Sequence, residues 1–328
     1  MVDLSTKYLG LSLSNPVIVG SSGLTSSVEG VKRVEAAGAG AIVLKSIFEE
    51  QIQKEIDRLV DESDESLWHP EASAYISTYG KENAVKVYLD LISETKKNVS
   101  IPVIASVHCT TLGEWTTFAK RAQDAGADAL ELNAFVLPAD PRRTGEDNEK
   151  FYFDVVGRVK SGVSIPLSIK LGAYFSNPLQ TLVDLSRTAL DGMVLFNRYY
   201  NVDIDIDALE LVPARPFSQP EEYITALRWV SILSGRVSCD IAASTGVHDG
   251  RTAIKQLLAG ATAVQMVSTL YENELSRIGE SLKEIEQWMS EKGFGQLSDF
   301  RGKLSQGASP NPAEYLRVQF MKYSVSQG

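Results

Sequence analysis

Short apolar runs recur along the chain, and helical patterning lies between most of them. The runs are almost continuously apolar and rich in valine and isoleucine, as expected of strands that are buried on both faces. Eight runs predict strands, at residues 16–20, 41–46, 102–107, 129–133, 166–171, 192–197, 237–244 and 263–269. Between them, apolar residues at helical spacing predict helices that include residues 28–35, 115–122 and 275–289.

The joins between these elements have a common form. Residues 35–44, 124–132 and 258–266 each run from a helix end of small residues, past a glycine, into an apolar strand. Eight strands alternating with helices over 328 residues predict an α/β fold, the (β/α)8 TIM barrel. An open parallel sheet is the alternative, because a sequence pattern does not show closure. However, no G-x-G-x-x-G turn follows any of the strands.

Two longer segments interrupt the alternation. An acidic insert at 48–92 follows the second strand, and residues 198–223 follow the sixth. Within the latter, residues 202–207 alternate with period two, which predicts an extra strand or a hairpin lid over one end of the barrel. We expect one barrel domain over residues 1–304 and a C-terminal tail, 305–328, that packs on the barrel.

The charge and composition limit the classes of binding partner and the cellular location. A net charge of −10 and a pI near 5.0 argue against nucleic-acid and anionic-membrane partners, which need a basic surface. Cys109 and Cys239 are too few for a disulfide framework, and the N-terminus lacks the pattern of a signal peptide. No run approaches the roughly 18 apolar residues of a membrane span. These features predict a soluble, cytoplasmic protein.

Polar side chains stand at the predicted strand ends, where barrel enzymes place their active sites. Lys45 and Lys170 together favour an anionic or electron-rich ligand, although either lysine alone could simply extend to solvent. Asn133 could equally cap the next loop, and His108 could be a core histidine. The strand ends carry Ser21, Ser22, Gly23, Lys45, Ser46, His108, Cys109, Glu131, Asn133, Lys170, Asn197, Arg198, Ser244, Thr245, Gly246, Ser268 and Thr269.

The last two strand ends suggest a phosphate site. Ser244, Thr245 and Gly246 lie between the seventh strand and a helix, and Ser268 and Thr269 follow the eighth strand. Small residues with free backbone N–H groups at a helix N-terminus bind phosphate well, although ordinary N-capping is the alternative for either stretch.

No metal site is expected. The aspartates at 203, 205 and 207 imitate the opening of a calcium loop. Ala208 and Ala214 stand where that loop needs glycine and glutamate, however.

Taken in order, these motifs resemble the dihydroorotate dehydrogenases, flavin enzymes built on an FMN-binding (β/α)8 barrel. The motifs are "NPVIVGSSG", "VLKS", "ELN", "SIKL", "FN", "STGVHDG" and "GATAVQMVSTL", followed by a closing segment at 291–304. The resemblance implies one noncovalent FMN and a CH–CH oxidoreductase of the soluble branch, with a place in pyrimidine biosynthesis. It implies that Lys170 stabilises the negative charge of the reduced flavin and that FMN also contacts Ser21, Ser22, Lys45, Asn133, Asn197, Ser244, Thr245, Gly246, Ser268 and Thr269.

The substrate-binding residues depart from the family pattern. The family places a cysteine or serine base shortly after the asparagine of the fourth strand, whereas Val136 stands there and cannot accept a proton. Arg198 replaces a small hydroxyl residue after Asn197, and the asparagine-rich loop is not recognisable in 66–84. Asn133, Asn197 and Arg198 suggest a pyrimidine-type or other small anionic substrate. His108 is our first candidate for the acid/base, and Tyr174 and His69 are the next candidates.

Two other functions stay open at this point. Lys45 or Lys170 could form a Schiff base in an aldolase-like enzyme, with the last two loops holding the phosphate of the substrate. The chain could also be a flavin-binding protein without dihydroorotate activity. A homodimer and an electron-transfer partner are both open, and no cysteine cluster in this chain suggests an iron–sulfur centre.

Overall fold

The computed structural model describes residues 2–49, 52, 70–108 and 112–318. His69, Cys109 and much of the acidic insert therefore lie outside the described residues. β5 (Ile47–Phe48) lies where the insert begins, and the insert contributes most of the long helix α3 (Pro70–Asn98).

Eight parallel strands form a closed barrel, as predicted. Each strand pairs with its neighbours in order, and the pairing of β4 with β6 completes the circle, which excludes the open sheet. The strands are β3 (Val17–Val19), β4 (Ala41–Val43), β6 (Val103–His108), β7 (Ala129–Asn133), β8 (Leu167–Leu171), β9 (Gly192–Leu195), β12 (Asp240–Ala243) and β13 (Ala263–Met266). All fall within or overlap the predicted ranges.

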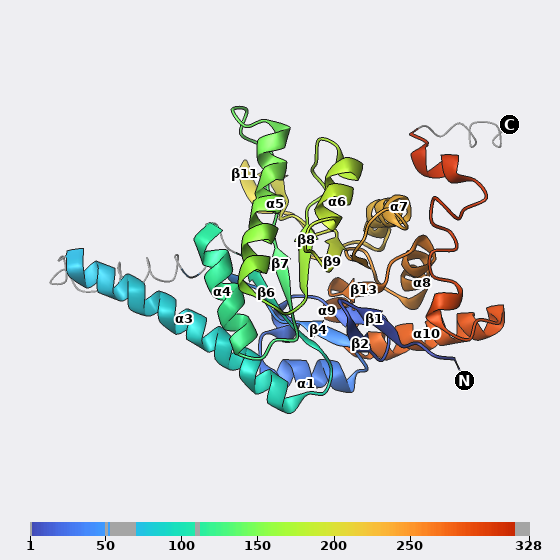
Figure 1. The fold of residues 1–328 in the computed structure, drawn as a ribbon, viewed down its shortest axis with the longest axis horizontal. Coiled ribbons are helices and arrows are strands. Elements are labelled where there is room, and N and C mark those ends of the chain that lie inside the picture. The colour runs from blue at the N-terminus through green and yellow to red at the C-terminus, as the bar shows by residue number, and fades with distance from the viewer. Residues whose placement is uncertain (1, 50–51, 53–69, 109–111, 319–328) are drawn as a thin grey trace.

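Helices lie around the outside of these strands (Figure 1). They bury an apolar face against the sheet; in α1, for example, Val31 and Val34 are buried, and the hydroxyl of Ser27 caps the helix by accepting from the backbone of Gly30. The helices are α1 (Val28–Ala36), α3, α4 (Leu112–Asp124), α5 (Gly145–Gly162), α6 (Pro178–Ser186), α7 (Tyr223–Leu233), α8 (Gly250–Ala259), α9 (Ser268–Glu272) and α10 (Ser276–Lys292).

A hairpin that the sequence pattern did not predict closes the amino-terminal end of the barrel. It consists of β1 (Thr6–Tyr8) and β2 (Leu11–Leu13), joined through Leu9 and Gly10, both of which have positive φ. Tyr8, Leu9 and Leu13 are buried in one cluster with interior residues of the barrel strands. Ligands therefore reach the barrel interior from the opposite, carboxyl end.

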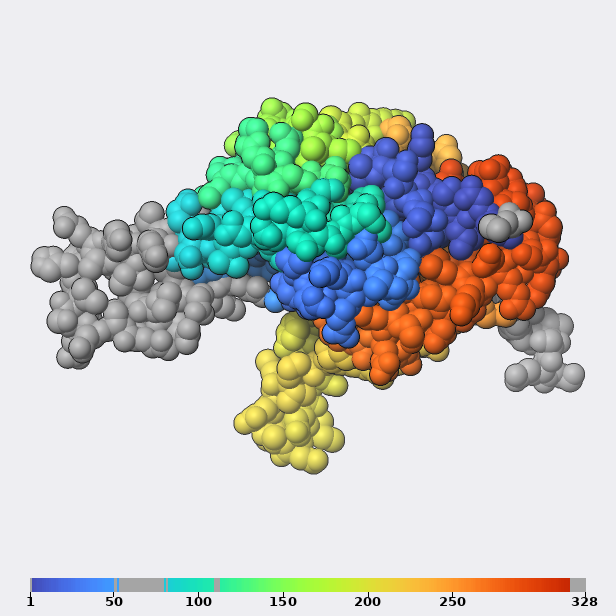
Figure 2. Space-filling model, turned by 90° about the horizontal axis from the view of Figure 1, so that it is seen from below, coloured from blue at the N-terminus to red at the C-terminus, as the bar shows by residue number. Residues whose placement is uncertain are grey.

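A second hairpin follows the sixth barrel strand, where an extra strand or hairpin was predicted. Its strands are β10 (Val202–Asp205) and β11 (Glu210–Pro213). The hairpin projects away from the barrel (the yellow arm in Figure 2), and its side chains are almost all exposed. Its role as a lid stays a prediction.

The segment after α10 packs against the helices that surround the last strands. Phe300 is buried, and the backbone nitrogens of Gly302, Leu304 and Gln306 donate to carbonyls of Leu257, Leu258 and Ser231. The short helices Leu297–Asp299 and Pro312–Leu316 lie in this segment. A domain boundary at residue 304 stays a prediction.

Candidate functional site

A cavity opens at the carboxyl ends of the barrel strands. Eight residues that the sequence singled out line it together: Ser21, Lys170, Asn197, Arg198, Ser244, Thr245, Gly246 and Ser268. Pro216, Ser218, Val247, Gln265 and Val267 complete the lining. These eight residues, from five of the strand ends, therefore lie together as the sequence predicted.

Lys170 lies at the inner end of this cavity, where β8 holds it in the barrel interior. Its Nζ donates to Oε1 of Gln265 at 2.8 Å, and Nε2 of Gln265 donates to Oε2 of Glu131 at 2.6 Å. Burial lowers the pKa of Lys170, and the carboxylate of Glu131 opposes that shift. Burial likewise raises the pKa of Glu131, against the charge of Lys170 and the hydrogen bond from Gln265. The ammonium group of Lys170 is thus held at the inner end of the cavity.

Three serine hydroxyls connect the cavity to the barrel interior. Ser21 Oγ lies 2.9 Å from Ser46 Oγ, which lies 2.6 Å from Ser106 Oγ. Ser106 is fully buried, and the phenol of Tyr88 bonds its backbone N–H and C=O. Tyr88 therefore occupies a place in the hydrogen-bond ladder where β4 and β6 separate.

The ends of β7 and β9 are tied together by amides. Asn197 Nδ2 donates to Asn133 Oδ1 at 2.9 Å, and Asn133 is buried. His108 Nδ1 lies 2.6 Å from the backbone carbonyl oxygen of Asn133, and the imidazole stacks on Phe135 with ring centroids 5.1 Å apart. Because a carbonyl only accepts, Nδ1 carries the proton, which leaves Nε2 unprotonated in the neutral ring.

The loop after β12 adopts the conformation that its glycine allows. Thr245 and Gly246 have φ of 74° and 75°, and a Cβ at Gly246 would lie 2.2 Å from the backbone nitrogen of Tyr223. Ser218 joins this loop to the next one, because its Oγ accepts from Gly246 N at 3.3 Å and its own N–H donates to Ser268 Oγ at 2.9 Å. His248 Nε2 lies 3.1 Å from the Ser218 hydroxyl.

Arg198 holds the segment that leads to Ser218. Its Nε donates to Glu222 at 3.1 Å, and its Nη1 donates to the carbonyls of Arg215 and Pro216. The guanidinium that was assigned to substrate recognition is therefore already engaged on at least two of its nitrogens, although it still lines the cavity.

The remaining candidates lie outside the cavity lining. The Lys45 side chain is exposed, whereas Ser22 Oγ is buried without a hydrogen-bond partner among the described residues. Thr269 is fully buried and donates to the carbonyl of His248 at 3.1 Å. The exposed Tyr174 packs on Tyr199, at 5.0 Å between ring centroids.

Val136 is held in place by two tyrosines. Its backbone nitrogen donates to Tyr152 OH at 3.0 Å, and its carbonyl accepts from Tyr199 OH at 3.5 Å. Burial raises the pKa of Tyr152 and of Tyr199, so both phenols stay protonated at neutral pH.

Gln265, Ser106 and Ser218 are parts of the site that the sequence reading missed. For Gln265 a signal existed, because an amide in the middle of the apolar run "AVQM" needs a buried partner. Ser218 carried no such signal, since its partners lie 28 to 50 residues further along the chain.

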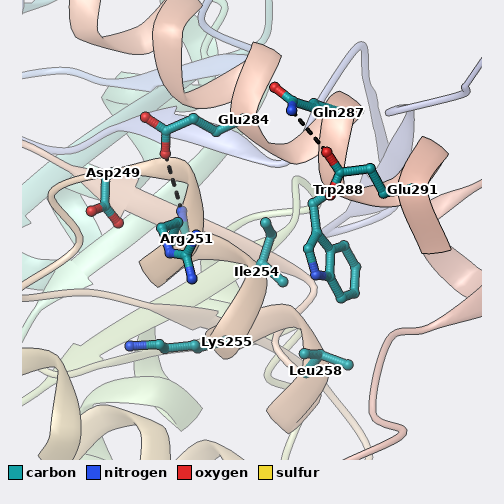
Figure 3. A pocket seen from close by; sticks show the side chains of 9 residues that line it. All are labelled: Asp249, Arg251, Ile254, Lys255, Leu258, Glu284, Gln287, Trp288 and Glu291. Carbon is teal, nitrogen blue, oxygen red and sulfur yellow. Dashed lines mark hydrogen bonds between the residues drawn. The ribbon is translucent and has the colours of Figure 1, made fainter.

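A second hollow lies between α8 and α10, on the outside of the barrel (Figure 3). Trp288, Ile254 and Leu258 form its apolar wall, and charged residues of both signs surround them. Glu284 accepts there from the backbone nitrogens of Gly250 and Arg251 and so satisfies the start of α8. Helix packing therefore accounts for this hollow.

The fold and the cavity define a class: (β/α)8 barrels with a cavity at the carboxyl ends of the strands, between an interior lysine and two loops rich in small polar residues. The profile of the family described as dihydroorotate dehydrogenase matches residues 3–289. The chain belongs to this family and is one of its oxidoreductases.

Similar proteins span nearly the whole chain. The catalytic subunit of dihydroorotate dehydrogenase B (NAD(+)) of Thermoplasma volcanium is 26% identical over 309 residues, which cover 92% of this chain and 98% of that protein. The subunit of the same name in Pyrococcus furiosus is 27% identical over 307 residues, 92% and 98% of the two chains. That of Geobacter sp. is 26% identical over 322 residues, 92% and 98%.

Proposed function

We propose that the protein is an FMN-dependent oxidoreductase that acts on a CH–CH bond of a small anionic or amide-bearing ring, of the pyrimidine type. The observation that carries this proposal is Lys170, fixed through Gln265 beneath the cavity that also contains Gly246 and Ser268. A cation at the inner end and hydrogen-bond donors at the outer end match the two polar ends of FMN.

The residues present fit that cofactor. Lys170 brings a buried amino group to the cavity, and Ser21, Ser244, Thr245 and Ser268 also line it with hydroxyl-bearing side chains. We assign the phosphate to the loops of Ser244, Thr245, Gly246 and Ser268, and the ring to Lys170, Asn133, Asn197 and Ser21, with Lys45 at its edge. FMN, when bound, would supply the hydride acceptor.

The chain's own residues would prepare the reaction. Lys170 is held before any charge forms on the ligand, so its stabilising effect costs no reorganisation at the moment of reaction. Asn133 accepts from Asn197, which leaves its NH2 group to donate to a ligand. His108 has Nε2 in the form that accepts a proton, and we assign it the acid/base role that Val136 cannot fill.

A second function is supported by one observation. Burial lowers the pKa of Lys170, and a lysine with a lowered pKa is the usual nucleophile of Schiff-base enzymes. In that reading the last two loops hold the substrate's own phosphate. Borohydride trapping of a carbonyl compound on Lys170 distinguishes the two readings, because the flavin enzyme would form no such adduct.

The names of the relatives suggest the electron path. They are catalytic subunits, which implies a separate electron-transfer subunit in those proteins. We propose that this chain also passes electrons to a partner protein, and a homodimer of the barrel is compatible with that arrangement.

The test uses the FMN-loaded protein under anaerobic conditions. Bleaching of the flavin by dihydroorotate would support oxidation of that substrate, and the reduced protein is then offered NAD(+), fumarate and a quinone. Bleaching by another reduced ring would support the reaction type with a different substrate. A flavin that no such donor reduces would contradict the proposal and favour a flavin-binding role.

A further inference from the structure

Glu131 is a buried carboxylate that no part of the proposed chemistry uses. Only 1% of it is exposed, and it lies in the barrel interior on β7. Its Oε2 accepts from Gln265, whereas its Oε1 has no hydrogen-bond partner among the described residues. A second oxygen without a partner is unusual for a buried carboxylate, and it leaves a place for a proton.

Gln265 separates this carboxylate from the ammonium group of Lys170. Its oxygen faces the lysine and its NH2 group faces the carboxylate, which is the orientation that suits a charged pair. The pair then has no net charge. A negative charge placed above Lys170 would leave the barrel interior with an excess of one negative charge, which is costly in a region of low dielectric constant.

We propose that Glu131 is an internal proton store, which takes up one proton when a negative charge forms on the ligand above Lys170 and releases it when that charge is removed. The inference rests on the proposed function, because the charge is the one that reduction leaves on FMN. Oxidation of the CH–CH bond supplies two electrons and two protons; one proton would accompany the electrons to FMN, and the other would form an O–H bond on the carboxylate of Glu131. Reoxidation reverses both transfers.

Among the titratable groups around it, Glu131 is the one that can take up a proton when the ligand becomes negatively charged. Burial raises the pKa of Tyr8, on β1, and of Tyr88, on α3, far above neutrality, so both phenols stay protonated. Lys170, on β8, gains charge stabilisation from the anion above it and keeps its proton. Burial raises the pKa of Glu131, so this carboxylate takes up a proton more readily than an exposed one does.

A chain of serine hydroxyls leads from the cavity to Ser106, the neighbour of Glu131 in the barrel. The hydroxyls of Ser21, Ser46 and Ser106 form a continuous chain that begins at the cavity. Ser106 and Glu131 are direct partners in the register of β6 and β7, so their buried side chains lie side by side on the inner face of the barrel. Serine hydroxyls both donate and accept, as a relay requires.

The experiment is an infrared difference spectrum of the FMN-loaded protein, reduced and reoxidised at an electrode. We expect reduction to produce the C=O band of a protonated carboxyl group, shifted in D2O and absent in Glu131→Gln. The exposed control Glu29→Gln, on α1, should keep the band. The midpoint potential should also lose about 30 mV per pH unit of its slope in Glu131→Gln, the contribution of one proton in a two-electron couple.

Wild-type spectra without this band, or a band that persists in Glu131→Gln, would overturn the proton store. The presence or absence of the band in the wild-type protein already tests the proton store, so this test does not depend on how the variant folds. Failure to bind FMN would overturn the proposed function together with this inference. Binding and reduction without the band would overturn the inference alone.

Discussion

Asn197 Nδ2 donates a hydrogen bond to Asn133 Oδ1 at 2.9 Å, and this bond joins the ends of β9 and β7 across the intervening β8. The bond fixes the direction of the Asn133 amide, whose NH2 group is left for a ligand. A carboxylate at position 197 would instead place an acceptor against an acceptor.

We therefore expect Asn197→Asp to weaken FMN binding about tenfold, which corresponds to about 1.4 kcal/mol. Fluorescence titration of the apoprotein with FMN measures this change. Asn201→Asp, on the exposed start of the projecting hairpin, adds the same charge away from the cavity and should bind FMN as the wild type does. Equal affinities for all three proteins would contradict the assignment of Asn133.

Gly246→Ala tests the loop assigned to the phosphate. Gly235 offers a matched control, since its φ of 77° is nearly the same as the 75° of Gly246 but no atom lies within 4 Å of a Cβ built there. Gly235→Ala should cost about 1 kcal/mol of unfolding free energy in urea, from backbone strain alone. Gly246→Ala should cost about 2–4 kcal/mol and also weaken FMN binding. Similar losses in both variants would mean that the contact with Tyr223 is relieved easily.

The variants His108→Ala and His108→Gln distinguish a positioning role of His108 from a role in proton transfer. Glutamine keeps an N–H donor for the carbonyl of Asn133 but cannot take a proton from carbon. Both variants should bind FMN, and both should lose about 100-fold or more in turnover of the true substrate. Retained turnover in His108→Gln would assign this residue to positioning, and retained turnover in both would remove it from the site.

Cys239 should be unreactive in the folded protein. Burial, together with the neighbouring Asp240, raises the pKa of its thiol to about 12, so almost none is thiolate at mildly alkaline pH. In Cys109→Ser, a thiol reagent should label the chain only after unfolding in urea. Rapid labelling of the folded variant would contradict the raised pKa of this half-buried thiol.

The sequence allowed the barrel to be predicted because its strands are buried on both faces and appear as apolar runs. Strand 237–244 proved shorter at its start, since Ser238 bonds Ser186 instead of a neighbouring strand. The hairpin at Thr6–Leu13 was missed because two three-residue strands leave too short an alternation. Closure itself depends on pairing between residues 42 and 103, which no local pattern contains.

For the site, the polar residues at the predicted strand ends include most of the residues that line the cavity. Contacts between distant segments were not predictable: Arg198 was assigned to the substrate, whereas its guanidinium also bonds Glu222 and two backbone carbonyls. The sequence shows Glu131 as a polar residue within an apolar strand. Its partner Gln265 lies 134 residues away, so their relation required the structure.

The most direct measurement of the central claim is the identification of the chromophore in the freshly isolated protein. We expect a yellow protein that releases FMN on denaturation, close to one molecule per chain, and an apoprotein that takes up FMN again to the same level. In Lys170→Met, added FMN should still bind, but its reduction should become harder. A colourless protein that binds no FMN at saturating concentration would contradict the account.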